Sequence, residues 1–164
     1  MAAWRVLQGC PCPASIAPYF ALLAEDCRKR GHRVTFNSIN RSDAAAPLLH
    51  RYGKRTQREI HADPALAAIS NPPGFSSHEL RSDGNAIYHT ARGLLLPEWQ
   101  QGVDVNDQDV GPMIAAAKAR GWTLQRPYSS GAEFHHLVFA RRPRPQGPRT
   151  MAKLVHLRAT LPRS

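Results

Sequence analysis

Four side chains in the second half of the chain are of the types that bind and use a catalytic metal ion. His78 follows a rigid Pro-Pro-Gly turn, and Asp104 lies within the short apolar run Gly-Val-Asp-Val. Glu133 and His136 stand three positions apart at the start of another apolar run. A carboxylate inside an apolar strand needs a reason, because a buried charge must be paired or bound to metal.

These residue types fit the requirements of a catalytic zinc ion. Such an ion takes about three protein ligands, drawn from imidazoles and carboxylates, and keeps one position open for water, whose pKa falls to roughly 7. A nearby carboxylate can then accept a proton, and a cationic donor can stabilise the oxyanion formed at an attacked carbonyl. His78, Asp104 and His136 can fill the three ligand roles, with Glu133 as the general base.

The elements that must position these residues are of mixed type. Apolar residues at helical spacing predict two long helices, capping signals predict two short ones, and apolar, alternating or β-branched runs predict four strands. The long helices are expected over Ala14 to Arg30 and Asp107 to Arg120, and the short ones end at Tyr52 and His61. The strands are expected over His32 to Ile39, Gly102 to Val105, Trp122 to Arg126 and Phe134 to Ala140. The mixed order and the terminal hairpin predict an α+β fold, with a small, largely antiparallel sheet flanked by helices.

The length of the chain is typical of a single domain, but its positive net charge is unusually large. The 164 residues suit one domain, whereas 22 Lys and Arg against 12 Asp and Glu give a formal net charge of +10. Such a surface favours an anionic partner: nucleic acid, anionic lipid or an anionic wall polymer. From position 141 the sequence becomes basic and proline-rich, so we expect a domain over 1–140 and a linker or tail over 141–164.

No segment approaches the length of a membrane span, and the first residues lack the pattern of a secretory signal. We therefore expect synthesis in the cytoplasm. The three cysteines, Cys10, Cys12 and Cys27, are an odd number, which argues against a disulfide framework. Small buried thiols are the expected reading, since their spacing matches no common zinc pattern.

The ordered combination of Ser76-x-His78, Gly-Val-Asp104 and Glu133-x-x-His136 resembles a known family. It is similar to the zinc D,D-carboxypeptidases and L-alanyl-D-glutamate peptidases of the peptidase M15, or VanY, type. The segments NPPGFSSHELRSDG and LPEWQQGVDVN look like the peptidase domains of endolysins from phages of actinobacteria. The resemblance covers His32 to Ala140 and implies the D,D-peptidase (hedgehog-like) type of α+β fold.

The resemblance also implies roles for individual residues. The first histidine, the aspartate and the last histidine of the family bind zinc, and the acid three positions before the last histidine is the base. A family arginine that contacts the scissile carbonyl or a substrate carboxylate corresponds to Arg41. Gln57 and Ser76 are expected to contact substrate, although a packing role for Gln57 is an equal alternative.

The spacing of the first two ligands departs from the family, which places its first histidine and its aspartate only a few residues apart. Here Asp104 lies 26 positions after His78. Residues 79–101 are therefore expected to form an inserted loop over or beside the cleft, where substrate selection would occur. Asp83 is the competing ligand, and we favour Asp104 because its apolar run resembles the family's strand, whereas Asp83 lies in a polar turn.

Adjacent histidines create a second ambiguity. In a strand His135 and His136 point to opposite faces, and strict alternation would place Glu133 with His135. The family spacing selects His136, which requires the strand to start after Glu133. His135 then becomes a supporting or exposed residue.

Two functional classes follow. The first is a zinc peptidase that hydrolyses the peptide stem of peptidoglycan, as an L-Ala-D-Glu endopeptidase or a D-Ala-D-Ala carboxypeptidase. It would be a monomer released to the cell wall during phage lysis, attracted to anionic wall polymers by its basic surface. The alternative is a non-catalytic basic protein that binds nucleic acid or such a polymer. No nucleic-acid partner is expected, because the basic residues are spread widely and no aromatic-and-basic signature accompanies them.

Overall fold

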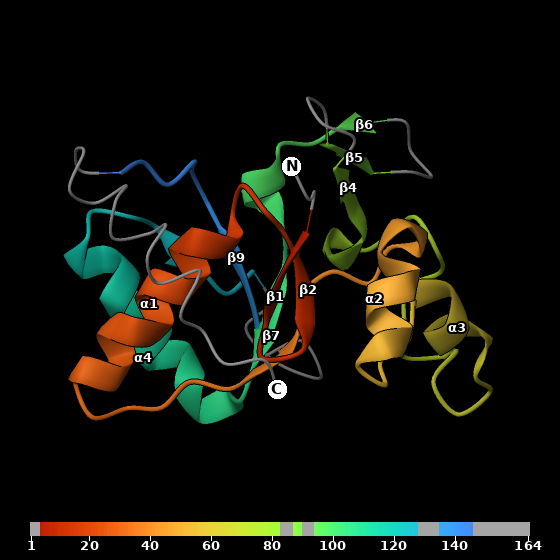
Figure 1. Ribbon diagram of the computed structural model, residues 1–164, viewed down its shortest axis with the longest axis horizontal. Helices are drawn as coiled ribbons and strands as arrows, with labels where there is room; N and C mark the ends of the chain where they lie inside the picture. Colours follow the sequence, from red (N-terminus) through yellow and green to blue (C-terminus); the bar gives the residue numbers. More distant parts are fainter. Residues whose placement is uncertain (1–3, 83–86, 90–93, 128–134, 146–164) are drawn as a thin grey trace.

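The structure is a computed structural model that describes residues 4–82, 87–89, 94–127 and 135–145 (Figure 1). Its α-helices are α1 (Ala17–Lys29), α2 (Ala46–Arg51), α3 (Gln57–Ala62) and α4 (Asp107–Ala119). Short 3-10 helices are η1 (Asp43–Ala45), η2 (Ser77–Glu79) and η3 (Glu98–Gln100). The strands are β1 (Trp4–Leu7), β2 (Cys10–Pro13), β3 (Phe36–Ser38), β4 (Leu80–Ser82), β5 (Ile87–His89), β6 (Leu94–Leu95), β7 (Val103–Val105), β8 (Leu124–Gln125) and β9 (His136–Phe139).

The central sheet has four strands in the order β3-β7-β9-β8, and every neighbouring pair is antiparallel. In Figure 1, α1 and α4 lie on one side of β7 and β9, and α2 and α3 lie on the other. A β1-β2 hairpin and a β4-β5-β6 sheet complete the described strands. The predicted α+β class with small antiparallel sheets is therefore confirmed.

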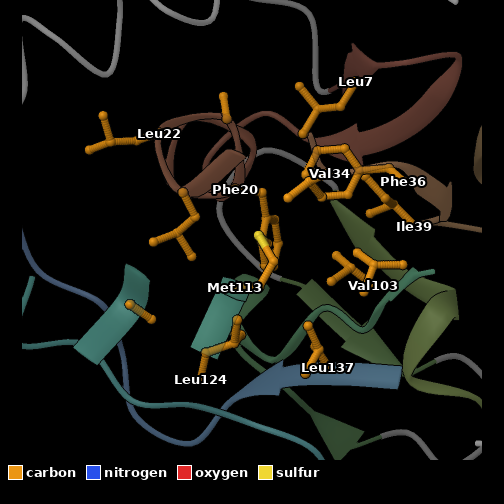
Figure 2. Packing of buried hydrophobic residues seen from close by; sticks show 14 of the residues in the cluster. Leu7, Phe20, Leu22, Val34, Phe36, Ile39, Val103, Met113, Leu124 and Leu137 are labelled. Atoms are coloured by element: carbon orange, nitrogen blue, oxygen red, sulfur yellow. The ribbon is translucent and has the colours of Figure 1, made fainter. Parts of the chain in front are cut away.

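The hydrophobic core lies against the face of the sheet that α1 and α4 cover. Val103 of β7 and Leu137 of β9 are completely buried there, and Figure 2 shows them near Phe20 of α1 and Met113 of α4. The ring of Phe20 stacks on that of Phe139, with centroids 5.3 Å apart. Because side chains alternate along a strand, the intervening residues of β7 and β9 point away from this core.

The predicted strand over His32 to Ile39 is much shorter than expected, since only β3 is formed. Side chains take the backbone groups that a neighbouring strand would otherwise bind. The carboxylate of Asp109 accepts a hydrogen bond from the Thr35 amide at 2.9 Å, and the Gln8 side chain donates to the Val34 carbonyl at 3.0 Å. A long-range polar contact of this kind has no signal in local hydrophobic alternation.

The expected loop over 79–101 is wrong in character. It contains the three strands of the β4-β5-β6 sheet and the 3-10 helix η3. The N-terminal hairpin was not anticipated either. Its two turn residues, Gln8 and Gly9, have positive φ of 52° and 76°, as a two-residue hairpin turn of type I′ requires. Glutamine is unusual at such a position, so the turn was not evident from the sequence.

The remaining expectations concern the cysteines, membrane-spanning helices and the C-terminal tail. Cys10, Cys12 and Cys27 are buried free thiols, as expected. None of the helices in the described ranges combines the length and apolar character needed to cross a bilayer. Of the predicted tail, residues 146–164 lie outside the described part of the chain.

Candidate metal centre

Asp104 and His136 meet because β7 and β9 are neighbours in the sheet. The two residues are directly opposite each other in the antiparallel register. Their flanking residues Val103, Val105 and Leu137 are completely buried in the core. Alternation therefore places Asp104 and His136 together on the opposite face. The described strand starts at His136, after the position of Glu133, as the ligand assignment required.

His78 reaches the same place from outside the sheet, on η2. The hydroxyl of Ser76 accepts a hydrogen bond from the His78 amide at 3.2 Å, and the Glu79 carboxylate accepts from the amides of Ser76 and Gly74 at 3.1 and 2.8 Å. This reciprocal capping fixes the start of η2. The Arg41 amide in turn donates to the His78 carbonyl at 2.5 Å, which fastens η2 to the segment after β3. Ser76 lines the cavity described below, but its hydroxyl oxygen also serves this cap.

Three potential ligand atoms converge at this point. His78 Nε2 lies 3.0 Å from His136 Nδ1 and 3.2 Å from Asp104 Oδ1, and His136 Nδ1 lies 3.0 Å from the same oxygen. Tetrahedral ligands at ordinary zinc distances of 2.0 to 2.1 Å would be separated by roughly 3.3 Å. A displacement of a few tenths of an ångström would therefore admit a zinc-sized ion.

The hydrogen bonds behind the ligand atoms favour a cation between them. His78 Nδ1 is 2.6 Å from the Ile39 carbonyl oxygen, which can only accept, so Nδ1 carries a proton and donates it. Neutral His78 then turns the bare lone pair of Nε2 toward the carboxylate oxygen of Asp104. His136 Nε2 lies 3.1 Å from the Ser77 hydroxyl, which can hold the tautomer that leaves Nδ1 bare. Imidazole and carboxylate donors suit several divalent transition metals, so the donor set fits a metal ion without selecting zinc.

The charge states agree with metal binding. Burial lowers the pKa of His78, and the positive charge of Arg41 lowers it further, so the neutral ligand form is favoured. Burial opposes ionisation of Asp104, but the hydrogen bond from His136 and the positive charge of Arg41 hold the pKa of its carboxyl below the usual range. Asp104 is therefore a carboxylate at neutral pH, and a metal ion need not displace a proton from it.

The cluster lies at the wall of a cavity of about 400 Å³ that Arg41 and Gln57 also line. Arg41 Nη1 lies 3.4 Å from Asp104 Oδ2, and Arg41 Nε donates to Gln57 Oε1 at 2.9 Å. Gln57 is held in turn by its side-chain Nε2, which donates a hydrogen bond to the Asn71 carbonyl at 2.6 Å. The predicted residues Arg41 and Gln57 are thus placed beside the ligands, with Gln57 orienting the guanidinium.

A second wall of the cavity is apolar and comes from residues 60–75. Ile60, Leu66, Ile69 and Phe75 line it. Ile69 is 69% exposed and Phe75 46%. A cavity with an apolar wall and a few convergent polar groups is the usual form of a binding site.

Two residues that sequence reasoning did not assign support the cluster, and a third, His135, was expected there as a supporting or exposed residue. Gln101, completely buried, donates to the Ile39 carbonyl at 2.9 Å, the same oxygen that orients His78. A Cβ placed on Gly102 would lie 2.3 Å from His136 Cε1, so only glycine leaves room for the ring in this position. The ring of His135 also lines the cavity. A glutamine and a glycine directly before the apolar strand were a weak signal for the first two.

Two residues of the predicted site, Glu133 and Asp83, lie outside the described residues. Asp104 lies with both histidines, as the ligand assignment expected. Within the described part of the chain, His78, Asp104 and His136 form the group of ionisable side chains close enough to share a metal ion.

Comparison of the chain with protein-family models, with curated proteins and with solved structures gives no match.

Proposed function

We propose that the protein is a zinc-dependent peptidase that hydrolyses the peptide stem of bacterial peptidoglycan. The observation that carries the proposal is the convergence of His78 Nε2, His136 Nδ1 and Asp104 Oδ1 on the wall of a cavity that also presents Arg41. The ordered resemblance to the M15-type peptidases supplies the substrate class. Identification of the cleavage products would distinguish an L-Ala-D-Glu endopeptidase from a D-Ala-D-Ala carboxypeptidase.

The roles of the residues follow from their positions and from that resemblance. A zinc ion held by the cluster would supply Lewis acidity, which polarises a carbonyl and acidifies water. Arg41 lies beside Asp104 and would donate to the oxygen of the attacked carbonyl as negative charge develops there. Glu133 would accept a proton from the attacking water and deliver it to the departing amine. The C–N bond breaks, and the water oxygen becomes part of the new carboxyl group.

The net charge of +10 is compatible with this substrate, because stem peptides and wall polymers carry anionic groups. The same charge supports the alternative, a non-catalytic protein that binds nucleic acid or an anionic polymer. That alternative gives no reason for a buried His-Asp-His cluster beside a cavity.

The test combines metal analysis of the purified protein with a turbidity assay on isolated peptidoglycan. We expect about one zinc ion per chain and clearing of the suspension. Glu133→Ala should abolish clearing while retaining zinc, because the base is not a ligand. Mass analysis of the released fragments distinguishes free D-alanine from cleavage after L-alanine. Wild-type protein that binds no zinc and leaves peptidoglycan intact would show that the proposal is wrong.

A further inference from the structure

His135 differs from the two histidine ligands in how its ring is held. Its backbone is fixed, because the His135 carbonyl accepts a hydrogen bond from the Val105 amide at 3.1 Å. It precedes β9, so strand alternation does not force its ring away from the side that His136 occupies. The His135 side chain is 37% exposed, and its Nε2 lies 3.8 Å from Asp104 Oδ2.

The ring nitrogens of His135 have no hydrogen-bond partner among the described residues. The 3.8 Å separation from Asp104 is beyond hydrogen-bonding range. By contrast, both ring nitrogens of His78 and of His136 are within 3.1 Å of polar atoms. A ring whose backbone is fixed and whose nitrogens lack a partner among the described residues is suited to receive a ligand.

The position of His135 relative to the cavity indicates what kind of molecule its ring would contact. The residue lines both the 400 Å³ cavity and a second one of about 360 Å³ that Asn37 and Asp107 also line. It faces Asp104 Oδ2, the oxygen that Arg41 Nη1 also approaches, while Oδ1 faces the other two ligands. His135 and Arg41 therefore lie near the same edge of the cluster, where each can present N–H groups to a bound molecule.

We propose that His135 is a further catalytic residue that donates a hydrogen bond to the substrate beside the bond that is cleaved. The acceptor is a peptide carbonyl or carboxylate oxygen of the stem, and Arg41 contacts the same region. Even the neutral imidazole carries one N–H, so the contact needs no change of protonation. The inference rests on the proposed peptidase function and adds a second donor to it.

The test uses the zinc-loaded full chain and the variants His135→Phe and His135→Asn. Phenylalanine retains a planar ring without a donor, whereas asparagine retains an N–H. We expect unchanged zinc content and a fall in kcat/KM on stem peptides of about 10- to 100-fold for His135→Phe, with partial recovery in His135→Asn. The affinity for an alanyl-alanine phosphinate, which presents anionic oxygens in place of the attacked carbonyl, should fall by a similar factor in a calorimetric titration.

His50→Asn is the matched control. The His50 ring lies on an exposed surface, 2.6 Å from Glu59 and outside the cavity. The activity and phosphinate affinity of the His50→Asn variant should therefore equal those of the wild type. If wild-type protein holds zinc and cleaves while His135→Phe is equally active, the inference alone is overturned. Loss of zinc in both His135 variants would also overturn it, because His135 would then be a ligand or a support for the ligands. Wild-type protein without zinc or cleavage overturns the peptidase proposal together with the inference.

Discussion

Two histidine–aspartate groups in this protein differ in how the oxygens of the carboxylate are matched with hydrogen-bond donors. His32 Nε2 lies 2.6 Å from Asp109 Oδ1, and the other oxygen of that buried carboxylate accepts from the Thr35 amide. Each oxygen of Asp109 thus has its own donor. Around Asp104 the histidine nitrogens converge on a single oxygen, and His78 turns a bare lone pair toward it.

The difference indicates what to look for in a buried polar group. A carboxylate whose oxygens are all matched by donors fastens one segment to another, here the start of α4 to the chain before β3. A group in which acceptors face one another is incomplete without a cation. Asp109 therefore has a structural role, whereas we propose Asp104 as a metal ligand, although both are buried.

The largest expected effect is the stabilisation of the fold by zinc, which should depend on Asp104 and not on Asp109. Zinc at a thousand times its dissociation constant should raise the free energy of unfolding of the wild type by about 4 kcal/mol. Asp104→Asn should lose nearly all of this increment, because an amide oxygen lacks the charge that holds the ion. Thermal unfolding with zinc and with a chelator measures the increment.

Asp109→Asn is the matched control for that experiment. It should keep the zinc increment but lower the stability of the metal-free protein by about 1 to 3 kcal/mol, because His32 or Thr35 loses a charged acceptor. If Asp104→Asn retains the increment, or if Asp109→Asn abolishes it, the division between a metal group and a fastening group does not hold.

A smaller effect is expected at Gly102, which the close-packed His136 ring requires. Gly102→Val would place its Cβ 2.3 Å from His136 Cε1 and 2.6 Å from Ser77 Oγ, so the ring must move from the ligand position. We expect zinc affinity to fall by about 10- to 100-fold, the range found when the support of a ligand is removed. Competition with a chromophoric chelator measures the affinity.

Gly111→Val provides the comparison. Gly111 is exposed on α4, and no atom lies within 4 Å of a Cβ built there. Valine at this position should leave zinc affinity unchanged, because Gly111 lies on the exposed face of α4. Equal affinities in the two variants would mean that the His136 ring does not depend on the space at Gly102.

The sequence predicted one side of this division, because it indicated Asp104 and His136 as partners in a metal site, but it indicated no role for Asp109. The apolar run Gly-Val-Asp-Val and the run at His136 predict one strand each, and the structure makes these strands neighbours. The central sheet and the long helices α1 and α4 were predictable because their apolar patterns are local. The β4-β5-β6 sheet was not, because its strands have only two or three residues each and are too short to show an alternating pattern, although their pairings are local in sequence. The roles of Gln101 and Gly102 required geometry as well: the sequence gives no measure of how closely a histidine ring packs on a glycine.

The smallest effect concerns the apolar wall opposite the ligands. Ile69 is 69% exposed, so Ile69→Ser should change the stability by no more than about 0.5 kcal/mol. If this wall contacts an alkyl group of the substrate, the variant should raise KM about 3- to 10-fold for a stem peptide containing alanine, with kcat little changed. A peptide with glycine in place of that alanine lacks the methyl group and should be hydrolysed similarly by both proteins. This combination of enzyme and substrate changes isolates the contact, and an equal loss on both peptides would instead assign Ile69 to the shape of the wall.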